Sequence, residues 1–256
     1  MHGRAYRLWP RGSGFPPPEP LFFAPLLERR LPIALPGFAP VLIAEDLACR
    51  RGERLVFTGV SFRLSAGEAL LLTGPNGSGK TSLLRILATL ITPAAGRLVW
   101  GNAPVDVEPA AYRAALHYVG HQDGVKPGLT PREALMFWAA LRGLGGKRMA
   151  PLIDKALTAF GLEAVADWPC RWLSAGQRKR LALAPLVATP AALWLLDEPT
   201  SALDHDSQIH LECAIAAHRA SDGLVAVASH TPIDVPDAGV LPLEAFAPST
   251  EYAAPD

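Results

Sequence analysis

The sequence predicts an α/β fold, and three observations support this class. A compact apolar run at 69–73 leads into a glycine-rich loop and then into a helical pattern. Two further runs, at 192–196 and 224–228, are almost wholly apolar, as parallel strands buried on both faces are. Between the first run and the other two, residues 124–172 switch to helical periodicity. A helical lobe is therefore expected to interrupt a core of buried strands.

The composition permits one large folded domain and argues against nucleic acid as a partner. The 256 residues are 50% hydrophobic, which is enough to bury a substantial core. The 24 basic residues balance 24 acidic ones, whereas a nucleic-acid-binding domain usually carries a net basic patch. Cys49, Cys170 and Cys213 are widely separated and lack metal-ligand spacing, which indicates reduced thiols of a cytosolic protein.

The sequence contains no apolar stretch that could cross a membrane as a helix. The nearest, 181–196, includes Pro185 and Pro190 and leads directly into Asp197 and Glu198. A spanning helix needs roughly 18 or more apolar residues without such breaks. Any membrane role must therefore come through a partner.

The chain divides into three predicted segments. Residues 1–40 hold nine of the 25 prolines and show no persistent period, so we expect a disordered extension without a signal peptide. The folded domain is expected over residues 41–236, with its helical lobe at about 124–185. Residues 237–256 are expected to form a C-terminal tail.

Short β-like runs begin the domain. The runs at 41–45, 54–57 and 60–64 are separated by turns, which favours an antiparallel sheet. After the strand at 69–73 and its glycine loop, we predict a helix over 81–90 and a strand over 97–100.

The helical lobe is predicted from a helix-start signal and an apolar pattern. Thr-Pro-Arg-Glu at 130–133 is a capping box with proline at the first helical position. Leu135, Trp138 and Leu141 follow at helical spacing, and we interpret them as core packing. A second helix is predicted over 150–160.

The glycine loop has the sequence of a phosphate-binding loop. Gly-Pro-Asn-Gly-Ser-Gly-Lys-Thr at 74–81 fits the pattern G-x-x-x-x-G-K-[ST] between a strand and a helix. Backbone N–H groups of such a loop surround phosphate oxygens, and the helix N-terminus adds partial positive charge. A glycine-rich turn with a chance lysine is the alternative, which the strand-to-helix context disfavours. The candidate nucleotide-binding residues of this segment are Gly74, Pro75, Asn76, Gly77, Ser78, Gly79, Lys80, Thr81 and Ser82.

Four residues suit a metal-assisted hydrolysis. Two lie in this loop, and two follow the apolar run at 192–196. Lys80 is expected to reach the β- and γ-phosphates, and Thr81 to offer its hydroxyl to Mg²⁺. Asp197 can hold Mg²⁺ directly or through water, and Glu198 can orient and polarise the attacking water. Two acids at a strand end can also be a solvated turn, but their pairing with the loop makes a catalytic role the stronger interpretation.

Ser-Ala-Gly-Gln at 174–177 is a second capping box, which opens a helix over 178–184. Either the motif is only a helix start, or its exposed N-terminus is offered to a γ-phosphate. In the second case Ser174, Gly176 and Gln177 would cap a phosphate held by the loop of a second, symmetry-related copy.

Three single residues extend the candidate site. Gln122 ends a β-like run at the entrance to the helical lobe, where it can sense Mg²⁺ or water, and it joins Thr81 and Asp197 as a candidate metal ligand. His230 follows the run at 224–228, where it can contact the γ-phosphate, and Arg51 can stack its guanidinium on adenine. Taken alone, each is more typical of a solvated surface residue.

Together these motifs resemble the nucleotide-binding domains of ABC transporters over about residues 41–233. The matching motifs are Walker A at 74–81, the Q-loop at Gln122, the LSAGQ signature at 173–177, Walker B at 193–197 with Glu198, the D-loop at 201–204 and the switch His230. The resemblance implies a P-loop NTPase core of the ABC ATPase type, with an antiparallel β subdomain and an inserted helical subdomain. It also implies an ATP sandwich dimer, closed by Ser174 and Gly176, and a docking groove near the Q-loop for a membrane subunit.

A narrower resemblance is to the ATP-binding subunit of the haem exporter of c-type cytochrome maturation. It rests on the runs 47–54, 74–84, 118–127 and 193–196, above all on Gly-His-Gln-Asp-Gly at 120–124. In that family an arginine commonly stacks on adenine, as Arg51 would. The sequence departs from it in two places: Thr200-Ser201 replaces the more usual Phe-Thr, and Pro185 stands where arginine is common. The proline is expected to kink the signature helix near Leu181.

The resemblance implies a subunit that hydrolyses ATP, with Mg²⁺, to power haem export or haem-chaperone release. The expected partners are a second copy of the chain and an integral membrane permease, which would hold it peripherally at the cytoplasmic face of the bacterial inner membrane. Nucleic acid and direct haem binding are not expected. An ABC transporter for another substrate is the nearer alternative. A soluble ABC ATPase acting on nucleic acid or ribosomes is less favoured, because one cassette is present and only 91 residues separate Thr81 from Leu173.

Overall fold

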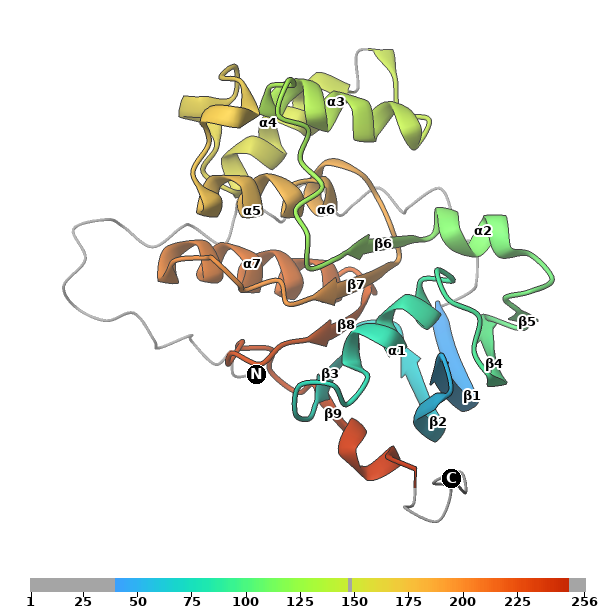
Figure 1. The fold of residues 1–256 in the computed structure, drawn as a ribbon. Coiled ribbons are helices and arrows are strands. Elements are labelled where there is room, and N and C mark those ends of the chain that lie inside the picture. Colours follow the sequence, from blue (N-terminus) through green and yellow to red (C-terminus); the bar gives the residue numbers. More distant parts are fainter. Residues whose placement is uncertain (1–39, 147–148, 249–256) are drawn as a thin grey trace, which may run out of the picture. The chain divides into compact units, whose positions relative to one another are not determined.

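The structure, a computed structural model, describes residues 40–146 and 149–248 (Figure 1). All of them belong to one compact unit. The predicted extension, residues 1–40, lies outside the described residues except for its last residue.

Two sheets form the framework of the described residues (Figure 1). One is antiparallel, in the order β2-β1-β4-β5, and the other is parallel, in the order β6-β7-β8-β3-β9. The predicted α/β fold is therefore confirmed. The strands are β1 (Val41–Arg51), β2 (Arg54–Ser65), β3 (Ala69–Thr73), β4 (Ala95–Trp100), β5 (Ala103–Pro104), β6 (Leu116–Val119), β7 (Leu193–Asp197), β8 (Leu224–Ala228) and β9 (Gly239–Pro242).

Helices cover the parallel sheet and build the inserted lobe, which Figure 1 shows as the green-to-gold group from α3 to α6. The capping box at 130–133 is present, since the Thr130 hydroxyl accepts from the Glu133 backbone N–H and the Glu133 carboxylate accepts from the Thr130 N–H. The helices are α1 (Lys80–Leu87), α2 (Pro109–Ala114), α3 (Pro131–Leu141), α4 (Met149–Ala159), α5 (Ala175–Leu183), α6 (Pro185–Ala188) and α7 (His205–Arg219).

The parallel sheet separates two hydrophobic cores. In β7, Leu193 and Leu195 pack on the side of α1 and the antiparallel sheet. Trp194 and Leu196 point to the other side, where they join a core that contains residues of α5, α6 and α7. Because all four are at most 4% exposed, β7 is buried on both faces, as its apolar sequence predicts.

The apolar pattern of α3 does not face the core as predicted. Leu135 is 0% exposed, but Trp138 is 46% and Leu141 62% exposed. A helix turns by about 100° per residue, so a step of three residues falls roughly 60° short of a full turn. After two such steps, Leu141 lies about 120° around the helix axis from Leu135. The buried face instead follows steps of four, through Pro131, Leu135 and Ala139.

Pro185 divides the signature helix instead of kinking it near Leu181. Helix α5 ends at Leu183, and Pro185 is the first residue of the separate α6. At a first helical position the missing N–H of proline has no partner to lose, which explains why the residue is tolerated. The Pro185 carbonyl accepts hydrogen bonds from both the backbone N–H of Thr189, at 3.0 Å, and its hydroxyl, at 2.9 Å.

Some boundaries differ from the sequence prediction. The runs at 54–57 and 60–64 form one strand, because register shifts in β1 keep it paired with β2. The helix predicted over 81–90 ends earlier, at Leu87. Thr89, two residues further on, has a left-handed φ of 57°, a conformation that commonly ends a helix. The predicted tail, residues 237–256, contributes β9 to the parallel sheet.

Within the described residues, none of the helices has the length and hydropathy that a membrane span requires. Cys49, Cys170 and Cys213 are free thiols.

A buried polar cluster joins α3 to the parallel sheet. Arg142, at the end of α3, donates to the Ala114 carbonyl at 2.9 Å and to His117 Nδ1 at 3.2 Å. His117 Nε2 lies 3.0 Å from the Thr189 carbonyl, to which it donates when Nδ1 is the acceptor. Burial and the Arg142 charge lower the pKa of His117 to about 3. Burial lowers the pKa of His218, which stacks on Trp194, to about 4.

The free energy of unfolding is expected to fall as the pH drops from about 6.5 towards 4. In this range the unfolded chain protonates both histidines while the folded chain does not, so protons favour unfolding. Each histidine contributes at most about 1.4 kcal/mol per pH unit. Urea unfolding at pH 7, 6 and 5 measures the slope. His117→Gln is expected to flatten it, whereas replacing the exposed His121 by glutamine is not. An unchanged slope in the first variant would contradict this account.

Candidate nucleotide-binding site

The glycine loop joins β3 to α1, as predicted (Figure 1). Gly74, Gly77 and Gly79 have φ values of 130°, 86° and 104°, which L side chains rarely adopt. A Cβ at Gly79 would lie 2.8 Å from the side chains of Val56 and Phe57. The sequence therefore needs glycine here both for the turn and for the close approach of β2.

The loop presents several groups suited to a phosphate. The Lys80 ammonium donates to the carbonyls of Gly74 at 2.6 Å and Pro75 at 3.2 Å, which holds it across the loop. The Ser78 hydroxyl is buried and has no hydrogen-bond partner in the part of the chain described. The first turn of α1 carries no acidic residue, so its partial positive charge is open to an anion. These residues fit the phosphates of ATP.

Thr81 and Asp197 meet beside this loop. The Thr81 hydroxyl donates to Asp197 Oδ1 at 2.9 Å, and the Tyr118 hydroxyl lies 3.4 Å from Oδ2. Asp197 is 1% exposed at the end of β7. Hydroxyl and carboxylate oxygens are ligands that Mg²⁺ takes in proteins, so this pair fits the ion.

Gln122, the third predicted magnesium ligand, is not joined to this pair. It lies exposed in the loop after β6, and no hydrogen bond links it to Thr81 or Asp197 among the described residues. Its role as a sensor of Mg²⁺ or water stays a prediction.

Glu198 and His230 form a pair that the sequence did not predict. Glu198 Oε2 lies 2.7 Å from His230 Nδ1 and accepts from the His230 backbone N–H at 3.2 Å. Glu198 has a φ of 51°, a strained conformation for a non-glycine residue. Its backbone N–H donates to the Ala228 carbonyl at 2.8 Å, which fixes this turn to β8. His230 thus orients the carboxylate, a role beyond the predicted contact with the γ-phosphate.

Side chains missed in the sequence hold the loops around this pair. The Thr200 hydroxyl lies 2.8 Å from that of Thr231 and 3.2 Å from that of Ser229. The loop after β7 is thereby tied to the loop after β8, which carries His230. The only sequence signal was the position of these hydroxyl residues just beyond the ends of two buried strands.

Arg51 lies beside the start of α1. Its Nε and Nη2 atoms donate to the Ser82 hydroxyl at 3.3 and 3.2 Å. The guanidinium is thus held next to the phosphate-binding loop, at the exposed end of β1. Stacking on adenine stays a prediction for Arg51, and Ser82 positions it.

The signature motif has the predicted capping geometry. The Ser174 hydroxyl accepts from the Gln177 N–H at 3.1 Å, and the Gln177 side chain accepts from the Ser174 N–H at 2.8 Å. A Cβ at Gly176 would lie 3.3 Å from the Ala202 carbonyl, so the motif packs closely on the D-loop. Helix α5 and helix α1 contribute to cores on opposite sides of the parallel sheet. Because the signature motif and the phosphate-binding loop of one chain start helices on opposite sides of the sheet, Ser174 and Gly176 are candidates for contact with the loop of another copy.

Comparisons with known proteins agree with this geometry. The ABC transporter family model matches residues 57–201. The cytochrome c biogenesis ATP-binding export protein CcmA of Rhodospirillum rubrum is 55% identical over 217 residues, which are 84% of this chain and 91% of that protein. The protein of the same name from Paramagnetospirillum magneticum is 50% identical and covers 81% of this chain and 96% of its own length.

Solved structures show the same fold. A putative ABC transporter ATP-binding protein from Pyrococcus furiosus superposes with a TM-score of 0.72 at 22% identity, over 81% of this chain and 100% of that one. The cbiO1 protein of Clostridium perfringens, part of an ABC transporter complex, gives 0.63 at 26% identity, over 74% and 78% of the two chains.

Glu198→Gln is expected to keep ATP binding and to lower ATP turnover by roughly 10²–10⁴, the usual contribution of a general base. The amide preserves the size of the side chain but cannot accept the proton of the attacking water. Phosphate release measures turnover, and ATP titration serves as the binding control. Near-normal steady-state hydrolysis by the variant would refute the assignment.

Arg51→Ala is expected to weaken ATP binding about tenfold, since a desolvated cation–π contact contributes on the order of 1–2 kcal/mol. Arg51→Tyr is expected to bind nearly as well, because an aromatic ring also stacks on adenine. Calorimetric titration gives the affinities, with Arg50→Ala as the matched control at a neighbouring exposed position. Equal affinities of the Arg51→Ala and Arg50→Ala variants would count against stacking.

Proposed function

The chain belongs to the ABC transporter family, and on that basis we propose that it powers haem export or haem-chaperone release in c-type cytochrome maturation. It is the ATP-binding, ATP-hydrolysing subunit of a cytochrome c biogenesis exporter. The observation that carries this conclusion is the similarity to export proteins of that process over four fifths of the chain.

The geometry supports a hydrolysis in which each group has one task. Lys80, Ser78 and the loop N–H groups bind the phosphates, while Thr81 and Asp197 would hold Mg²⁺. The ion supplies positive charge that stabilises the transferred phosphoryl group. Glu198 accepts a proton from the attacking water, and His230 keeps its carboxylate in place through the 2.7 Å contact.

We propose that two copies share each ATP. The exposed N-terminus of α5, with its small residues at 175 and 176, suits the γ-phosphate held by the loop of a second copy. In that arrangement Ser174 donates its hydroxyl and Gly176 its backbone N–H. Opening and closing of this pair would be the motion that ATP drives.

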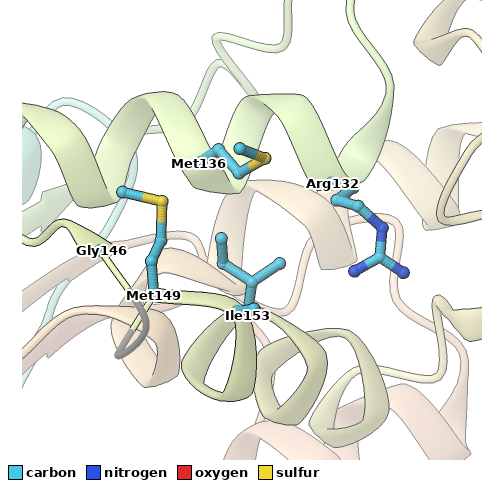
Figure 2. A pocket seen from close by; sticks show the side chains of 6 residues that line it. Arg132, Met136, Gly146, Met149 and Ile153 are labelled. Carbon is cyan, nitrogen blue, oxygen red and sulfur yellow. The ribbon is translucent and has the colours of Figure 1, made fainter.

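We place the membrane permease on the exposed face of the helical lobe near the Q-loop. Met136, Phe137, Trp138 and Leu141 of α3 are 43–62% exposed. The Lys126 ammonium, from the loop that follows Gln122, lies 4.9 Å from the centre of the Phe137 ring. A hollow of about 150 Å³ opens between α3 and α4, and Figure 2 shows Met136, Met149 and Ile153 around it. An apolar segment of a membrane subunit suits this surface.

Through that permease the subunit would lie at the cytoplasmic face of the bacterial inner membrane. An ABC transporter for another substrate would use the same ATP chemistry, because this subunit need not touch the cargo. The similarity to cytochrome c biogenesis proteins favours the haem pathway over that alternative.

Deletion of the gene is expected to abolish the c-type cytochromes of the source bacterium. A plasmid with the wild-type gene is expected to restore them, and the Glu198→Gln variant is not, because export needs hydrolysis. Haem staining of membrane proteins after electrophoresis measures the result. Normal cytochrome levels in the deletion strain would remove the haem function and leave the ATPase assignment intact.

A further inference from the structure

Lys179 is a buried cation that the proposed mechanism does not use. It lies in α5, two residues after Gln177 of the signature motif, and is 1% exposed. Its Nζ atom is buried without a hydrogen-bond partner in the described part of the chain. Lysine is rarely fully buried unless it is paired, because a desolvated ammonium without a partner is strongly unfavourable.

Three carboxylates act on this ammonium. Burial lowers the pKa of Lys179, and the charges of Asp123, Asp197 and Glu198 oppose that shift, with Asp123 the strongest of them. Asp197 already accepts from Thr81, and Glu198 is engaged by His230. Asp123 makes neither a hydrogen bond nor an ion pair among the described residues, and it follows Gln122 directly. It is therefore the carboxylate that remains available to Lys179.

We propose that Lys179 is a positioning residue for ATP hydrolysis, which pairs with Asp123 and so holds the Q-loop against the signature helix. The charge of Asp123 acts on Lys179, but the two side chains form no ion pair among the described residues, so a movement of the Q-loop would be needed to join them. Formation of the pair would remove the cost of the buried, unpartnered ammonium. That stabilisation would fix Gln122 relative to the signature helix α5, whose N-terminus is the part that we propose contacts a second copy.

This inference rests on the proposed function, since the pair has a task only in a protein that hydrolyses ATP. The pair would connect the signature helix to the nucleotide-binding site of the same chain. This connection would not depend on the proposed contact between the signature motif and another copy. Because Lys179 is buried and Asp123 is half-buried, salt would screen the pair less than it screens an exposed one.

The test uses the complex purified with its membrane subunit and compares Lys179→Met, Asp123→Asn and the double variant. Each single change is expected to lower kcat about tenfold while the ATP affinity stays within about twofold. The double variant is expected to be no slower than either single one, because both remove the same interaction. Lys179→Arg, which keeps the charge, is expected to retain most of the turnover. Asp154→Asn is the control, since it breaks an exposed pair with Arg132 in the same lobe.

A second measurement separates positioning from stability. Lys179→Met is expected to unfold at the same or a higher urea concentration than the wild type, because methionine suits an apolar site better than an unpaired ammonium. Wild-type turnover in Lys179→Met, or losses that multiply in the double variant, would overturn the proposal, and so would a fall in turnover matched by a fall in stability. If the wild-type complex itself hydrolysed no ATP, the ATPase function would fail and this role with it.

Discussion

The hydrogen bond between the Thr81 hydroxyl and the Asp197 carboxylate joins segments that are 116 residues apart, and the site depends on it. The register of the parallel sheet makes this contact possible. In β8, Ala228 pairs on one side with Leu72 of β3 and on the other with Asp197 of β7. The phosphate-binding loop and the acid therefore leave the sheet at the same level, from the two strands β3 and β7 that flank β8. Because β8 also ends there, His230 reaches Glu198 from the next loop.

The same sheet explains which parts of the site a sequence can predict. Residues 74–81 and the acids at 197–198 are short local patterns, and a strand on one side of each fixes where they lie. The pair of Glu198 and His230 is not local, because it depends on how far the loop after β8 turns back. Its distinctive feature, the left-handed backbone of Glu198, has no sequence signal, since neither glycine nor asparagine marks it. Lys179 was equally hidden, because a lysine in a polar run of a helix is usually solvated.

The helices and strands also differ in how well the sequence predicts them. Buried strands were predicted almost to the residue because an all-apolar run has few alternatives. The face of α3 was predicted wrongly because three apolar residues at steps of three do not make a single stripe. Strand β9 was missed because an edge strand of four residues that starts with glycine, ends with proline and buries only Leu241 differs little from a tail.

The helical lobe joins the sheet in two ways, through polar contacts at the end of α3 and through the hydrophobic core that α5 and α6 share with β7. Arg142 closes α3 onto the carbonyls of Ala114 and Leu116 at the start of β6, while the far end of the lobe carries the signature motif. The Q-loop runs between these two places, directly after β6. Because α5 and α6 pack in one core with Trp194 and Leu196 of β7, the helix that starts at the signature motif is coupled to the sheet through close-packed side chains. The strand ends that carry the nucleotide-binding residues are thus connected to the lobe both through the Q-loop after β6 and through the core beneath α5.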